Sequence, residues 1–182
     1  MTGTVLESDR LSLRPLEDGD AARIFALIND FEIVRNLSMV PWPYERSMAD
    51  DFIRDSEVQA REATAIRRAI VPKDQPELIG IIDMRFRERR TGIFGYWIGR
   101  DFWGMGYTSE ALGVFVDFAF NDLGMSRVRA EALQENLASL GVMKKNGFTP
   151  GDPVFQDRPN FGDTVVMQRM WLTRSDWEAA RS

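Results

Sequence analysis

The stretch Trp103–Leu112, W-G-M-G-Y-T-S-E-A-L, joins the short apolar run Ile93–Ile98 to a segment with apolar residues at helical spacing as far as Leu123. Its glycines, Gly104 and Gly106, let the backbone turn tightly and approach a ligand closely. The first N–H groups of a helix have no intrahelical partner, and the helix dipole adds partial positive charge there. The stretch therefore predicts a strand, a turn and a helix that bind a phosphate group without a basic side chain.

Outward from this turn, apolar periodicity predicts strands and helices along the whole chain. Before the turn we expect a strand at Leu11–Arg14 and two helices, at Asp18–Ile28 and Ser47–Glu62. A hairpin of two strands follows at Ala65–Val71 and Leu78–Phe86. After the helix that follows the turn, we expect a strand at Val128–Leu133, a helix at Asn136–Asn146 and a strand at Val165–Leu172. A short helical tail ends the chain. This order predicts a mixed sheet with helices on its faces, and residues 1–182 contain no linker that would divide the domain.

Cysteine and histidine are both absent from the 182 residues. Their absence excludes disulfides, a cysteine nucleophile, the Ser-His-Asp mechanism and the usual zinc ligands, so we expect no metal. Any enzymatic chemistry must therefore use carboxylates, hydroxyls, backbone amides or water.

The net charge of −5 argues against a nucleic-acid partner. We interpret the one basic run, R-F-R-E-R-R at Arg85–Arg90, as the solvated end of a strand and its turn, with contact to an anionic ligand as the alternative. No apolar run is long enough to span a bilayer and no secretion leader is recognisable, so we expect a cytoplasmic protein without a membrane partner.

Four ordered motifs identify the phosphate ligand more closely than the glycine turn does. Neither the P-loop pattern nor the third glycine of a dinucleotide fingerprint is present. The motifs are G-Y-W-I at Gly95–Ile98, the turn itself, E-N-L-A-S at Glu135–Ser139 and K-N-G-F at Lys145–Phe148. In this order they resemble the GNAT superfamily of acetyl-CoA-dependent N-acetyltransferases. With L-S-L-R-P-L at Leu11–Leu16, the chain looks most like the branch of ribosomal-protein N-terminal acetyltransferases.

The resemblance implies an α+β, three-layer sandwich whose mostly antiparallel sheet is splayed between two parallel strands, with helices on both faces. It places acetyl-CoA in the V-shaped opening between Ile93–Ile98 and Val128–Leu133. The pantetheine arm would pair with the backbone of Tyr96, Trp97 and Ile98. Backbone amides would hold the pyrophosphate at Trp103, Gly104, Met105, Gly106, Tyr107 and Thr108. Asn136 would bind the pantetheine amides, and Ser139 would lie near the thioester sulfur. A monomer or a homodimer fits the family.

Two positions depart from the family pattern. The phosphate motif has Trp103 and Thr108 at its flanks, although the backbone N–H of Thr108 stays available. Met143 occupies the position where many members have a tyrosine that protonates the leaving thiolate, and methionine has no proton to donate. Our hypothesis is that Ser139 replaces it, the alternative being that Ser139 only bonds the backbone at its helix start.

Direct attack of an amine on the thioester is the mechanism that the residue types favour, because no cysteine or histidine can form an acetyl-enzyme. A backbone N–H near Trp97 and Ile98, where the family strand bulges, would stabilise the thioester oxygen. The amine must be neutral, and an α-amine with a pKa of about 8 needs less help from a base than a lysine with about 10.4. Candidate bases are Glu131, Asp83 and Glu32; the alternative for Asp83 is a solvated carboxylate on a strand, and for Glu131 an outward-facing strand residue.

The acceptor is the open part of the prediction. Aromatic and acidic residues of the entry segment could line its pocket, or could simply cover the core: Phe31, Glu32, Trp42 and Tyr44. The predicted function is acetyl transfer to a primary amine, and a protein N-terminal α-amine is one such acceptor. The alternatives are a small-molecule amine, such as a polyamine, an amino acid or an aminoglycoside, and a catalytically silent acyl-CoA-binding module.

Overall fold

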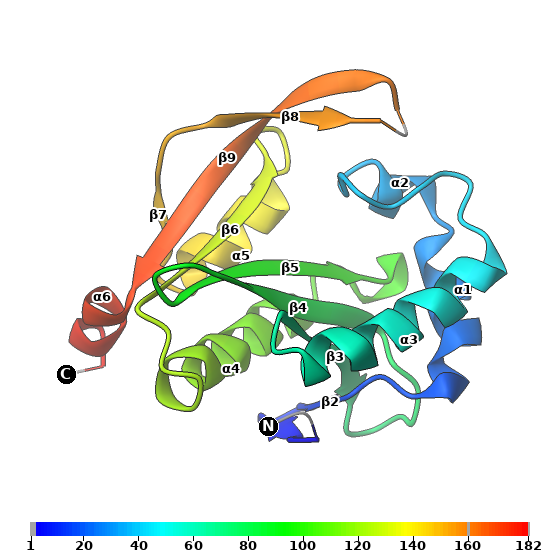
Figure 1. Cartoon of the computed structure of the whole chain (residues 1–182), viewed down its shortest axis with the longest axis horizontal. Coiled ribbons are helices and arrows are strands. Elements are labelled where there is room, and N and C mark those ends of the chain that lie inside the picture. The colour runs from blue at the N-terminus through cyan, green and yellow to red at the C-terminus, as the bar shows by residue number, and fades with distance from the viewer. Residues whose placement is uncertain (1–2, 160, 182) are drawn as a thin grey trace.

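A nine-stranded sheet forms the centre of the computed structural model, which describes residues 3–159 and 161–181 (Figure 1). The strand order is β1-β2-β3-β4-β5-β6-β9-β7, and β8 pairs with β9 beside this path. Every pair is antiparallel except β5 with β6, which is parallel. The strands are β1 Leu6–Glu7, β2 Leu11–Arg14, β3 Ala65–Pro72, β4 Gly80–Arg87, β5 Thr91–Ile98, β6 Arg127–Leu133, β7 Thr149–Pro150, β8 Val154–Arg158 and β9 Asp163–Thr173.

Helices cover both faces of this sheet, which confirms the expected three-layer architecture. Successive residues of a strand point to opposite faces, so Ile81 joins the core under α1 and α3 while Ile82 joins the core under α4. The helices are α1 Ala21–Ile28, α2 Phe31–Val34, α3 Arg46–Arg61, α4 Tyr107–Asn121, α5 Leu137–Lys145 and α6 Arg174–Ala179, with 3-10 turns at Asp18–Asp20 and Arg100–Phe102.

The expected elements are present with shifted ends, and the largest shift has a side-chain cause. The helix expected from Asp18 starts at Ala21, after the 3-10 turn. Both carboxylate oxygens of Asp20 accept from Arg14 at 2.8 Å, and one of them also accepts the backbone N–H of Glu17. These bonds hold the chain in the turn. The sequence reasoning missed β1, α2, β7 and β8.

The parallel pair of strands separates in the middle of the molecule. Thr91–Phe94 of β5 pairs with Arg127–Ala130 of β6, and the pairing ends there. Figure 1 shows the two strands diverging beyond that point, with β6 running on towards α5. The second halves of β5 and β6 are therefore not paired with each other, and we call this divergence the gap; the resemblance implied a V-shaped opening at this place.

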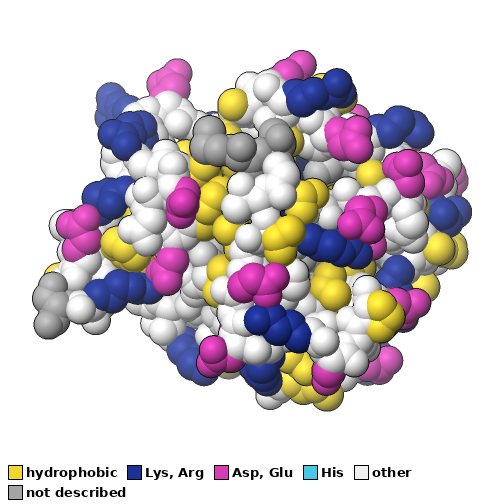
Figure 2. All heavy atoms as spheres, turned by 90° about the horizontal axis from the view of Figure 1, so that it is seen from below, with side chains coloured by type: hydrophobic (Ala, Val, Ile, Leu, Met, Phe, Trp, Pro, Cys, Tyr) yellow, Lys and Arg dark blue, Asp and Glu magenta, His cyan; other side chains and the backbone are white. Residues whose placement is uncertain are grey.

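Charged side chains of both signs are mixed on one face of the molecule. Figure 2 shows acidic and basic side chains interspersed on the face seen from below, without a large area of one sign. Within the part of the chain that the structure describes, no helix is long and apolar enough to cross a membrane.

Candidate active site

The glycine turn has the geometry that the sequence predicted. Gly104 and Gly106 have φ angles of 76° and 82°, a region that favours glycine, and Gly106 is the N-cap residue of α4. The ring N–H of Trp103 donates to the carbonyl oxygen of Ile98 at 2.9 Å. This bond ties the turn to the end of β5, so the amides at the start of α4 lie beside the end of the gap.

A basic side chain also lies at this turn, which sequence reasoning missed. Arg10, before β2, donates to the carbonyl oxygen of Met105 at 3.1 Å, and its guanidinium lies 4.6 Å from the ring centroid of Tyr107. Arg10 also pairs with Glu110 at 2.6 Å. Burial raises the pKa of Glu110, but hydrogen bonds from Ser8 and Arg10 lower it more, so it stays below its ordinary value. Only the fold brings Arg10 to the turn, and no local pattern signals it.

The gap has a pair of hydroxyl groups on the side that faces α4 and α5. The Tyr96 hydroxyl of β5 lies 2.9 Å from the Ser139 hydroxyl of α5 and also donates to the Ser139 carbonyl oxygen at 3.2 Å. Burial raises the pKa of Tyr96 to about 12, so its phenol stays protonated at neutral pH. Sequence reasoning used only the backbone of Tyr96, so it missed this second hydroxyl group beside Ser139.

Asn136 has both of its amide atoms engaged within the protein. Its side-chain oxygen accepts the backbone N–H of Ser139 at 3.1 Å and caps α5. Its amide nitrogen donates to the side chain of Asn36 at 3.1 Å, which connects α5 to the segment after α2. The amide nitrogen keeps a second N–H and the oxygen a second lone pair for the expected contact with pantetheine amides, which stays a prediction.

The opposite side of β5 has a carboxylate at the point where the gap begins. Asp83 of β4 pairs in register with Gly95 of β5, and a Cβ on Gly95 would lie 2.9 Å from an Asp83 carboxylate oxygen. Glycine at 95 thus leaves the room that this carboxylate occupies. Burial raises the pKa of Asp83 to about 6, against the opposing effects of Arg85 and Arg67. A carboxylate with this pKa is ionised at neutral pH and can accept a proton.

Glu131 is in a different environment from Asp83. One of its carboxylate oxygens lies 2.9 Å from Arg169 and 3.2 Å from Arg129. Two guanidinium groups therefore compete with an amine for the same oxygen. Of the two strand carboxylates, Asp83 has the surroundings of a base and Glu131 those of a structural ion pair.

The entry segment contributes an aromatic cluster over the Asp83 side of the sheet. The ring centroid of Phe31 lies 5.6 Å from that of Trp42 and 6.3 Å from that of Phe161, in edge-on geometry. Both Phe31 and Trp42 are exposed, whereas Tyr44 is buried in the core with α1 and α3. Glu32 pairs with Arg35 at 3.3 Å. Phe31 and Trp42 can thus meet a ligand, while Tyr44 supports the core.

The prediction of a bulge in β5 is wrong. Residues of β4 and β5 pair one to one from Gly80 with Ile98 to Arg87 with Thr91, without an extra residue. The strands instead approach closely at the end of β5, where a Cβ on Gly80 would lie 2.3 Å from the Trp97 carbonyl oxygen. Glycine at 80 thus allows regular pairing to continue. Among the described residues no cluster of metal-ligating side chains is present.

Comparison with known proteins identifies the family. The model of the acetyltransferase (GNAT) domain matches residues 10–149, more than half of the chain. The chain belongs to the GNAT acetyltransferase family. This acetyltransferase uses acetyl-CoA as its acyl donor, and the matched residues include β5, the glycine turn and α5.

Relatives extend over nearly the same length as this acetyltransferase. An uncharacterized N-acetyltransferase, YoaA of Bacillus subtilis strain 168, is 33% identical over 146 residues, which are 79% of this chain and 82% of YoaA. The microcin C7 self-immunity acetyltransferase MccE, solved with acetyl-CoA and AMP, has a TM-score of 0.80 at 19% identity, covering 91% and 93% of the two chains. RimL, a ribosomal L7/L12 α-N-protein acetyltransferase solved with coenzyme A, has 0.82 at 18%, covering 93% and 98%. At these identities the two structures show a shared fold.

Proposed function

We propose that this acetyltransferase transfers the acetyl group of acetyl-CoA directly to the α-amine of a polypeptide N-terminus. The observation that supports this acceptor is the Asp83 carboxylate over Gly95, at the opening of the gap between β5 and β6. An α-amine has a pKa of about 8, so a base with a pKa of about 6 can take its proton at modest cost. A lysine amine, with a pKa of about 10.4, would need a stronger base.

Acetyl-CoA would lie with its pyrophosphate on the amides of the glycine turn and its pantetheine arm along the end of β5. Neighbouring residues of a strand project to opposite faces, so Gly95 opens towards Asp83 and Tyr96 points towards α5. A thioester in the gap would then have a proton acceptor on one face of β5 and two hydroxyl groups on the other.

The two hydroxyl groups would return a proton to the departing thiolate. Ser139 Oγ can accept the Tyr96 hydroxyl proton while it donates its own proton to sulfur. The amine nitrogen forms the new bond to the acetyl carbon, the carbon–sulfur bond breaks, and the amine proton passes to Asp83. Asp83 then loses this proton to solvent and the Tyr96 phenolate regains one from solvent, which restores both groups. Met143 then does not have to be a proton donor, because Tyr96 and Ser139 supply the hydroxyl groups.

A competition between amines tests this acceptor. A peptide with a free α-amine and one internal lysine is incubated with acetyl-CoA, beside the same peptide blocked at its N-terminus and a panel of polyamines, amino acids and aminoglycosides. We expect tandem mass spectrometry to locate the acetyl group on the α-nitrogen of the free peptide and to find the blocked peptide unchanged. Products formed only from the small amines would contradict the proposal, and acetyl-CoA binding without any product would favour a silent module.

A further inference from the structure

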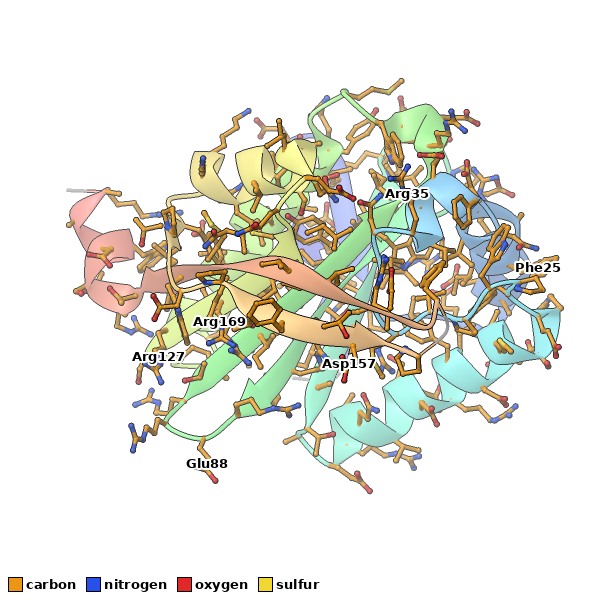
Figure 3. All side chains as sticks on the ribbon, turned by 90° about the horizontal axis from the view of Figure 1, so that it is seen from above. Phe25, Arg35, Glu88, Arg127, Asp157 and Arg169 are labelled. Atoms are coloured by element: carbon orange, nitrogen blue, oxygen red, sulfur yellow. The ribbon has the colours of Figure 1, made fainter. Side chains whose placement is uncertain are left out.

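Five arginine side chains of β4, β6 and β9 lie on one face of the sheet beside the proposed acceptor position. They are Arg85 and Arg87 of β4, Arg127 and Arg129 of β6 and Arg169 of β9, which together form the arginine surface. The register places them on one face: Ile93 pairs with both Arg85 and Arg129, and Arg129 pairs with Trp171. Figure 3 shows Arg127 and Arg169 close together, and both guanidinium groups lie within 6.0 Å of the centroid of the Trp171 ring.

The arginine surface has more positive charge than its own carboxylates neutralise. Glu131 forms ion pairs with both Arg129 and Arg169, and a carboxylate oxygen of Asp83 lies 3.9 Å from the guanidinium group of Arg85. Within the described chain, Arg87 and Arg127 have no carboxylate in ion-pair contact; Arg127 donates instead to the hydroxyl of Thr91 at 3.0 Å. The surface therefore has five guanidinium groups and two carboxylates, one of which is the proposed base.

The cations are also close enough to affect each other. Burial lowers the pKa of Arg129, Glu131 raises it, and the charges of Arg169, Arg85 and Arg87 lower it further. Three guanidinium groups surround the ring of Trp171, with centroid distances of 4.9 Å for Arg127, 5.7 Å for Arg129 and 6.0 Å for Arg169. The ring attracts these cations but cannot neutralise them, so an anion would be stabilised here.

From this geometry we infer that the arginine surface binds an acidic segment that directly follows the acetylated α-amine of a polypeptide acceptor. This inference rests on the proposed function and specifies its substrate. Residues two apart along a strand are separated by about 6.6 Å. Along the strand direction, Arg85 and Arg129 therefore lie about 6.6 Å from Asp83, and Arg87 and Arg127 lie about 13 Å from it. An extended peptide covers about 13 Å in four residues. Acidic side chains among the first five residues of a peptide can therefore reach both pairs of arginines. A small amine bound at the gap would reach neither pair.

Steady-state kinetics on three peptides of equal length test the inference. Positions two to five are aspartate in the first, asparagine in the second and lysine in the third. We expect kcat/KM to be at least tenfold higher for the aspartate peptide than for the asparagine peptide, and to fall with added salt. The charge reversal Arg127→Glu should lower kcat/KM for the aspartate peptide at least tenfold and raise it for the lysine peptide. Arg54→Gln, which changes an exposed arginine of α3 outside the surface, should leave all three values unchanged.

Binding of the N-acetylated aspartate peptide, measured by calorimetry, separates this inference from the proposed function because it needs no turnover. Affinity that falls tenfold in Arg127→Glu and persists in Arg54→Gln supports the arginine surface even if no peptide is acetylated. Equal kcat/KM for the aspartate and asparagine peptides, with weak binding of both products, would overturn the inference and leave α-amine acetylation standing. Free glutamate or inorganic phosphate that binds as tightly as the peptide would overturn the assignment to a polypeptide.

Discussion

Replacing Asp83 by asparagine should weaken catalysis and stabilise the fold at the same time. Burial raises the pKa of Asp83 from 3.8 to about 6, so ionising it costs the folded state more than the unfolded state. Two pKa units correspond to about 3 kcal/mol, an upper value because the side chain keeps 26% of its exposure. At pH 7 the carboxylate is ionised in both states and this cost is fully present. Below about pH 4 it is protonated in both states and the cost disappears.

Two measurements on the Asp83→Asn variant check the predicted gain in stability and the predicted loss of catalysis. Urea unfolding of wild type and Asp83→Asn should show the variant more stable by roughly 1 to 3 kcal/mol at pH 7, with the difference shrinking towards zero at about pH 3. The variant's kcat/KM for a peptide α-amine should fall by about 10² to 10⁴. Its pH profile should lose the rise through about pH 6 and keep only the rise from ionisation of the amine.

The combination excludes a merely structural role for Asp83. A variant that loses stability at pH 7 would refute the inference that burial destabilises the ionised carboxylate. A variant with wild-type kcat/KM and an unchanged pH profile would refute its role as a base, whatever its stability. Asp157→Asn, at an exposed position of β8, is the matched control and should change neither quantity.

Three further predictions concern the other parts of the site and the core. Tyr96→Phe and Ser139→Ala should each lower kcat about tenfold, and the double variant should lose little more, because the two hydroxyl groups act as a unit. Single-turnover rates with the same peptide measure this effect. An unchanged kcat in Ser139→Ala would rule out the proton-donor role of Ser139. Gly106→Ala should destabilise by about 1 to 2 kcal/mol at its φ of 82° and weaken acetyl-CoA binding at least tenfold by calorimetry, with Gly3→Ala as control. Phe115→Ala in the core should lower the free energy of unfolding by about 3 to 5 kcal/mol in urea.

Long periodic segments made most of the fold predictable. The apolar spacing through α4 follows the helix that the structure contains, and Phe115 lies in the core between α4 and the sheet. Three of the four elements that sequence reasoning missed are too short for a period to develop, since β1 and β7 have two residues each and α2 has four. Periodicity also predicts nothing about the bonds of Asp20, which turn the start of the first helix into a 3-10 turn.

The candidate site was predictable only where its residues are neighbours in the chain. The glycine turn is one continuous stretch, and the sequence placed both its glycines correctly. Asp83 was one of three candidate bases, and its distinction depends on the register that brings it over Gly95. Arg10 at the turn, and Arg127 beside Thr91, come from distant segments, so only tertiary structure reveals their positions.

A structure with a bisubstrate conjugate tests the central claim most directly. In this molecule the sulfur of CoA is joined through an acetyl linker to the α-nitrogen of the aspartate peptide. We predict that the conjugate passes through the gap between β5 and β6, with its phosphates on the amides of Gly104–Thr108 and its nitrogen beside Asp83. A nitrogen that emerges on the Tyr96 side, or a conjugate bound outside the gap, would contradict the account.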